Sequence, residues 1–189
     1  MNNKLQVHPS LYIAICVGLF LLPIPWLISW IIAAFLHEIG HIVALKILHV
    51  PVHRVTAEVK GAYIETGFLP PRAEFVCALA GPLCGLVCFI MFLKWLPLLA
   101  VCGLVQSIFN LLPYPNYDGG RILSIALNTF LPINIARIVY QGITFCVSAA
   151  LIILGIYFWF ELNLGFIALI VCVIPVFKSG TIKIPCKQR

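Results

Sequence analysis

The sequence predicts an all-α polytopic membrane protein with about six transmembrane helices and a short β-hairpin on the cytoplasmic side. Of its 189 residues, 62% are hydrophobic and only 10% are charged, whereas soluble domains carry about a quarter charged residues. A membrane-spanning helix needs about 20 predominantly apolar residues, and the chain has enough apolar length for roughly six. No length then remains for a soluble domain, so residues 1–189 are expected to form a single membrane domain.

The expected elements follow from apolar runs and from the residues that interrupt them. Pro23 and Pro25 end the first span, because proline breaks the helical hydrogen-bond ladder. Residues 52–66 predict a β-hairpin, since β-branched and polar residues flank a turn at Gly61; a plain connecting loop is the alternative. Turn-forming residues follow the fourth span, and a short interfacial helix is expected over residues 120–131. The predicted spans cover residues 5–22, 26–48, 73–96, 98–112, 135–160 and 162–177.

The distribution of basic residues predicts the orientation in the membrane. The net charge is +6, but with six spans and a cytoplasmic N-terminus every Lys and Arg except Lys94 falls on the inside. This asymmetry is typical of a multi-pass plasma-membrane protein with both termini in the cytoplasm. It argues against a nucleic-acid partner. The basic end, residues 178–189, suits an anionic inner leaflet or serves only as a stop-transfer anchor.

The eight cysteines predict no disulfide framework. All except Cys186 lie in apolar segments, where a free thiol behaves as a small hydrophobic side chain. Cys77, Cys84 and Cys88 share one helical face, which leaves a thiolate metal site as an alternative.

The second predicted span carries a chemical motif, His37-Glu38-Ile39-Gly40-His41. On a helix, residues four apart share a face, so both histidines can bind one metal ion while Glu38 reaches a metal-bound water as general base. The alternative is a pair of core histidines beside an incidental glutamate. That alternative is weakened because an unpaired glutamate in hydrocarbon costs several kcal/mol.

A catalytic zinc site usually has three protein ligands and one open position. Asp118 is the expected third ligand, because it follows a proline-bracketed interruption of an apolar segment, and irregular backbone at membrane depth lines polar cavities. Its alternative role is to cap a helix that begins at Gly119. His49 and His53 are expected to be interfacial or hairpin residues. The other acidic residues belong to loops or span ends: Glu58, Glu65, Glu74 and Glu161.

Three motifs together resemble the site-2 protease family of intramembrane zinc metalloproteases. They are the histidine motif at 37–41, Ala80-Gly81-Pro82-Leu83, and Asn110-Leu111-Leu112-Pro113 followed by Asp118-Gly119. Their order and separation match that family over about residues 10–130. One departure is Cys84, at a place where many relatives carry an asparagine.

The resemblance implies one Zn²⁺ per chain, held by His37, His41 and Asp118, with Glu38 as general base. It also implies that Asn110 positions the substrate backbone near the metal and that the break at Pro113 borders the substrate. The expected reaction is hydrolysis of a peptide bond in or near a transmembrane segment of a membrane-bound protein. The chain is similar in build to the prokaryotic sporulation-type branch, which cuts membrane-bound transcription-factor precursors, and a regulatory membrane protein is a further expected partner.

Two other functions fit the same motifs. The first is a metal-binding or metal-transporting membrane protein without hydrolysis, although few further buried acidic or histidine residues exist to form a transport path. The second is an inactive relative that binds transmembrane partners without cutting them. In both, Glu38 would be dispensable.

Overall fold

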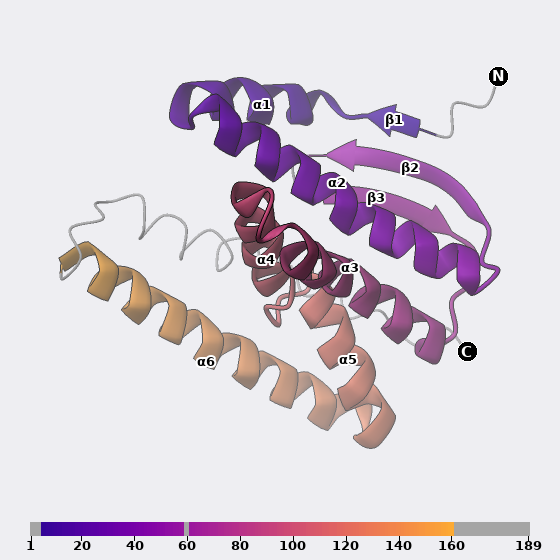
Figure 1. Cartoon of the computed structure of the whole chain (residues 1–189). Coiled ribbons are helices and arrows are strands. Elements are labelled where there is room, and N and C mark those ends of the chain that lie inside the picture. Colours follow the sequence, from indigo (N-terminus) through magenta and orange to yellow (C-terminus); the bar gives the residue numbers. More distant parts are fainter. Residues whose placement is uncertain (1–4, 59–60, 161–189) are drawn as a thin grey trace. The chain divides into compact units, whose positions relative to one another are not determined.

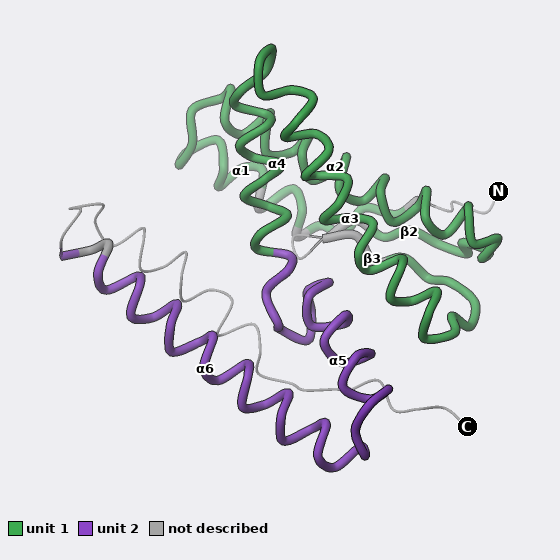
Figure 2. Tube along the Cα trace, turned by 60° about the horizontal axis from the view of Figure 1, so that its bottom comes forward, with its two compact units in different colours: residues 1–109 green, residues 110–189 purple. Residues whose placement is uncertain are grey.

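The computed structural model describes residues 5–58 and 61–160 (Figure 1). The chain forms two compact units, unit 1 over residues 1–109 and unit 2 over residues 110–189 (Figure 2). We describe each unit by itself. The single domain expected from the sequence stays a prediction.

Unit 1 contains three strands and four helices. The chain enters the long helix α2 through Pro23 and Pro25, which fit the first helical turn because its N–H groups have no partner within the helix. Pro70 and Pro71 start α3 in the same way. In chain order the elements are β1 (Leu5–Val7), α1 (Pro9–Leu21), α2 (Ile24–Ile47), β2 (Val52–Glu58), β3 (Gly61–Thr66), α3 (Pro71–Phe92) and α4 (Pro97–Asn110).

The three strands form one sheet in the order β1-β2-β3. Strands β2 and β3 pair antiparallel, which confirms the hairpin, and β1 pairs parallel with β2 so that Leu5 lies opposite Val55. Residues 5–7, expected in the first span, form a strand instead, so this prediction is wrong. The three residues Leu5, Gln6 and Val7 are too few to distinguish a strand from a helix, and pairing with β2 decides the outcome. Helix α1 begins only at Pro9 and has 13 residues.

Small residues bring the helices of unit 1 close together. A methyl group added to Gly40 in α2 would lie 2.7 Å from the carbonyl oxygen of Ala80 and 2.8 Å from Cβ of Cys84, both in α3. A methyl group on Gly85 of α3 would collide with the hydroxyl of Ser107 in α4. Such close backbone approach is typical of packed membrane helices. The Ala80-Gly81-Pro82-Leu83 stretch of α3 is one place where another helix comes this close.

Unit 2 contains helices α5 (Asp118–Phe130) and α6 (Ile133–Phe160), which pack against each other. Helix α5 is the short helix expected from the sequence, and it begins two residues earlier than the predicted range. The predicted span 162–177 lies outside the described residues.

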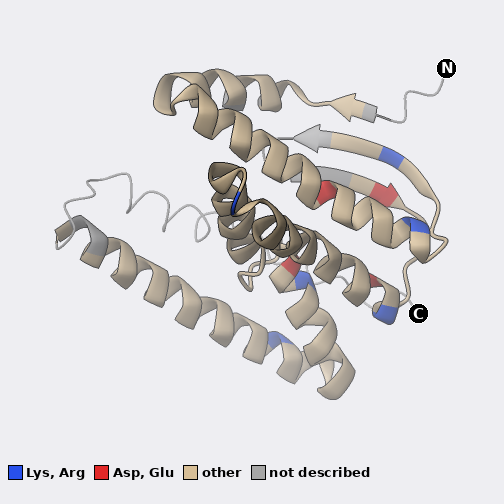
Figure 3. Ribbon diagram, viewed as in Figure 1, with Lys and Arg blue, Asp and Glu red and all other residues tan. Residues whose placement is uncertain are grey.

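In the part of the chain that the structure describes, three helices are long and apolar enough to cross a membrane: α2, α3 and residues 133–157 of α6. Each carries large apolar side chains on its surface, such as Phe35, Ile90 and Phe145, as expected where lipid replaces water. Figure 3 shows that charged residues are sparse along these helices. The mostly helical membrane fold with a short sheet is thus confirmed, while the number of spans stays a prediction.

Candidate metal centre

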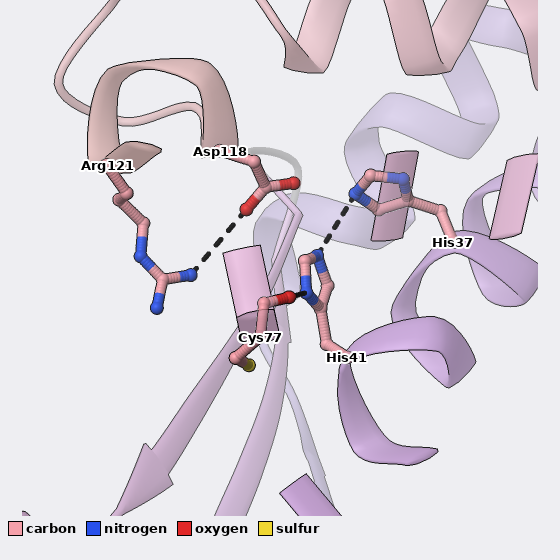
Figure 4. A network of polar contacts seen from close by, with 5 residues as sticks. All are labelled: His37, His41, Cys77, Asp118 and Arg121. Carbon is pink, nitrogen blue, oxygen red and sulfur yellow. Dashed lines mark hydrogen bonds and ion pairs between the residues drawn. The ribbon is translucent and has the colours of Figure 1, made fainter. Parts of the chain in front are cut away.

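His37 and His41 lie on one buried face of α2, exposed by 5% and 6%. Their Nε2 atoms are 3.2 Å apart (Figure 4). Two histidine nitrogens on one tetrahedral zinc ion, each bound at about 2.0–2.1 Å, lie about 3.4 Å apart. The separation in the structure is close to this value, so the two rings are arranged as a pair of metal ligands.

A backbone carbonyl orients the second ring. The Nδ1 atom of His41 lies 2.8 Å from the carbonyl oxygen of Cys77 in α3. A carbonyl only accepts, so Nδ1 must carry the proton and donate it. In the neutral ring, Nε2 then has its lone pair available for a metal. Metal-binding histidines usually donate their other ring N–H to a carbonyl or a carboxylate in this way, which fixes the orientation of the ring.

Gly81 provides the space in which the two rings meet. A methyl group there would collide with Nε2 of His41 and would lie 2.8 Å from Cε1 of His37. Only a residue without a side chain leaves the nitrogen edges open at this point. The nitrogen donors, the carbonyl that orients one of them and the open space at Gly81 together fit a zinc ion.

Glu38 follows His37 directly and is half-buried. The motif predicts that its side chain lies beside the two histidines, where a general base for a bound water would be needed. Lys46, in the last turn of α2, is the only other charged residue of this helix.

In unit 2, Asp118 is the first residue of α5 and is 8% exposed. Tyr117 is the N-cap, and it makes no side-chain cap hydrogen bond, so Asp118 does not hold the capping position that was its alternative role. The guanidinium of Arg121 lies 3.6 Å from its carboxylate (Figure 4). A buried carboxylate beside a cation at a helix N-terminus is held in place as an anion.

The break before Asp118 is fixed by glycine packing. Methyl groups on Gly119 and Gly120 would collide with the carbonyl oxygens of Leu111 and Tyr114. The first turn of α5 therefore lies directly against the backbone of the preceding loop, which only glycine permits.

Helix α6 anchors the same loop through two hydrogen bonds. The hydroxyl of Ser148 donates to the carbonyl of Thr144 at 2.7 Å, so the 2.8 Å bond between Tyr114 and Ser148 has the tyrosine as donor. The hydroxyl of Thr144 also donates to the carbonyl of Pro113 at 3.0 Å. Tyr114 is 1% exposed, so its ring holds the loop against α6 as well.

Within unit 1 the structure brings His37 and His41 together, as the motif predicts. The place of Glu38 beside them stays a prediction. Asp118 and Pro113 belong to unit 2. That they form one site with the two histidines stays a proposal. Asn110 is half-buried at the end of α4.

Two further histidines lie outside this site, as expected. His49 and His53 are exposed, one after α2 and the other in β2. The role of the Cys77 carbonyl could not be predicted from the sequence, because a backbone acceptor leaves no mark in it. Gly81 was noted only as part of a motif, and the structure shows that its small size makes room for the rings.

Two known proteins resemble this chain. Stage IV sporulation protein FB of Bacillus subtilis is 28% identical over 150 residues, which are 71% of this chain and 51% of that protein. The chain thus spans about half the length of this relative. The site-2 protease from Methanocaldococcus jannaschii superposes with a TM-score of 0.64 at 21% identity, over 93% of this chain and 88% of that one. No model of a protein family matches.

Both relatives fit the family that the motifs resemble. The solved structure shows that the chain has the site-2 protease fold. The name of the sporulation protein agrees with the sporulation-type branch that the sequence resembles. With the apolar helices, these findings support a membrane location.

Proposed function

We propose that this chain is an intramembrane zinc metalloprotease of the site-2 type. The observation that carries the proposal is the pair of buried imidazoles on α2, with Nε2 atoms 3.2 Å apart and one ring oriented by the carbonyl of Cys77. Buried ionisable groups in a membrane helix are costly and mark function. The likeness to the sporulation protein of Bacillus subtilis and to the site-2 protease of Methanocaldococcus jannaschii supports the reaction class.

The proposed metal ligands are His37, His41 and Asp118. All three are buried, and together they are two nitrogen donors and one carboxylate oxygen, a donor set that catalytic zinc uses. When bound, a zinc ion supplies Lewis acidity and lowers the pKa of its water to about 7. The hydrogen bond from His41 to Cys77 holds the ring in the tautomer that leaves Nε2 free. The ion pair with Arg121 and the packing of Gly119 hold Asp118 at its place in unit 2.

Glu38 is the proposed general base. Its carboxylate takes a proton from the attacking water and passes it to the leaving amine, so one side chain serves both steps. The half-buried position limits competing water while leaving the carboxylate within reach of the site.

The substrate must unwind, because a helix hides its carbonyls in its own hydrogen bonds. We propose that Asn110 positions the unwound backbone and that the break at Pro113 borders it. Among the described strands, β3 is the edge of the sheet, and we propose that its other side pairs with the extended substrate segment. The edge strand of a sheet is a template for such pairing.

The substrate class proposed is a membrane-bound protein, such as a transcription-factor precursor, cut in or near its transmembrane segment. We place the chain in a prokaryotic plasma membrane with both termini in the cytoplasm, because the basic residues gather on that side. A regulatory membrane protein that controls access to the site is a further proposed partner.

The test compares membrane and cytosolic peptides from a host that expresses the wild-type chain, the Glu38→Gln variant or a Glu74→Gln control. Glu74 lies in the first turn of α3 and has no role in the proposed chemistry. We expect a fragment with a new end in or near a spanning segment from the wild type and the control only. Glu38→Gln should keep its zinc.

Two results would count against the proposal. If the host with Glu38→Gln also releases the fragment, Glu38 is not the general base. The same peptides from all three hosts, with zinc bound in each, would favour a metal-binding protein without hydrolysis.

A further inference from the structure

Gln106, in the middle of α4, has a buried amide oxygen that the proposed chemistry does not use. This Oε1 atom is shielded from solvent, and no donor within the described residues reaches it. A buried acceptor without a hydrogen bond costs about 1–3 kcal/mol. Buried polar atoms without a hydrogen-bond partner are rare in folded proteins, so each one needs an explanation.

The glutamine lies on the face of α4 that packs into unit 1. Residues 99, 102, 103 and 107 of this helix are buried, at the spacing of one helical stripe, and residue 106 falls within it. Gln106 is therefore directed toward α2 and α3 rather than toward lipid.

Packing contacts give the direction of the helices. Gly81 of α3 lies against His41, and Phe92, further along α3, packs against the buried cluster that contains Ala33, so α3 runs opposite to α2. The contact of Gly85 with Ser107 and that of Phe92 with the cluster containing Leu99 show that α4 runs opposite to α3. Helices α2 and α4 thus run in the same direction.

This direction sets the level of Gln106. Ala33 belongs to one buried cluster with Leu99 and Cys102, which places it within about one helical turn of both residues along α4. Four residues beyond Ala33 stands His37, and four residues beyond Cys102 stands Gln106. The orphan amide of Gln106 therefore lies within about one turn of the level of His37, inside unit 1.

The spacing along α4 fits an extended peptide. Gln106 and Asn110 are four residues apart, which is about 6 Å along a helix. In an extended strand, backbone groups that point to the same edge recur every two residues, about 6.6–6.8 Å. Two amide side chains one turn apart can thus contact one edge of the same strand.

We propose that Gln106 is a second substrate-positioning residue, whose Oε1 accepts a hydrogen bond from a backbone N–H of the unwound substrate. That N–H lies two residues from the position held by Asn110. The inference rests on the proposed function. It adds a second point on α4, one helical turn before Asn110, at which the substrate backbone is held. The cost of the orphan acceptor in the free protein is offset when the substrate supplies its donor.

The test uses the full chain with zinc in lipid vesicles, and a labelled Leu-rich transmembrane peptide with a central Gly-Gly pair as substrate. Gln106→Met keeps the length of the side chain and removes its hydrogen bonding. Gln141→Met is the matched control, because Gln141 is exposed on α6. We expect kcat/KM of Gln106→Met to fall about three- to tenfold, the size of one neutral hydrogen bond, with the control unchanged. Thermal stability of Gln106→Met should stay equal or rise, since a buried orphan is removed.

A second arm locates the contact on the substrate. Peptides in which one backbone N–H at a time is replaced by an ester oxygen are cleaved by wild type and by Gln106→Met. At one position the ester should slow the wild type and have no further effect on the variant, which is the signature of a direct pair.

The outcomes separate the two proposals. If the wild type cleaves and Gln106→Met matches it, or loses activity together with thermal stability, the positioning role is overturned while the protease stands. If the wild type with zinc leaves every peptide intact and releases no host fragment, the proposed function fails, and the role of Gln106 fails with it.

Discussion

Gly81→Ala tests the metal centre at its tightest point. The added methyl carbon would lie 2.6 Å from Cε1 of His41 and 2.8 Å from Cε1 of His37. Carbon atoms in contact prefer separations of about 3.5–4.0 Å, so the rings or the helices must shift by roughly 1 Å. Protein ligands hold a metal within about 0.2 Å of its ideal distances. The substitution should therefore disturb metal binding directly.

The expected loss is about 10- to 100-fold in zinc affinity, the size found when the support of a metal-binding histidine is removed. Overpacking should also lower the free energy of unfolding by about 1–3 kcal/mol. Zinc affinity is measured by competition with a chromogenic chelator on the purified full chain in detergent, and stability by thermal unfolding of the same sample without metal.

Gly142→Ala is the matched control. Gly142 is also a helical glycine, in α6, but a methyl group there meets nothing within 4 Å. The control should bind zinc as the wild type does and gain up to about 1 kcal/mol in stability, because alanine favours a helix over glycine. Wild-type zinc affinity in a folded Gly81→Ala protein would refute the arrangement of the two rings described above.

Two further predictions concern the backbone. Gly120→Ala forces a methyl group into the carbonyl of Tyr114 and to 2.8 Å from the hydroxyl of Tyr140. We expect the free energy of unfolding to fall by about 1–3 kcal/mol, measured by thermal unfolding. An unchanged melting temperature would contradict the packing of α5 against the loop. His49 has φ of 56° after the end of α2, a conformation that glycine adopts without strain. His49→Gly should raise the stability by about 1 kcal/mol, and a lower melting temperature would show that the imidazole has a role of its own.

Local patterns in the sequence determined much of this protein. The spacing of His37 and His41 on an apolar helix was enough to predict that the rings meet, because the helical repeat alone puts residues four apart on one face. The hairpin at 52–66 followed equally from nearby residues, since β-branched side chains on either side of Gly61 favour two paired strands. Long apolar runs predicted α2, α3 and α6, although their ends shifted by a few residues.

Only the tertiary structure decided the features that depend on distant parts of the chain. Cys77 orients His41 across 36 residues of sequence, through a backbone oxygen that every residue type has. Leu5, Gln6 and Val7 form a strand because β2 offers an edge to pair with, which a run of three residues does not reveal. The orphan oxygen of Gln106 likewise follows from how α4 packs. Spacing along one helix is a local property, whereas a partner, a lack of space or a lost hydrogen bond arises only when separate segments come together.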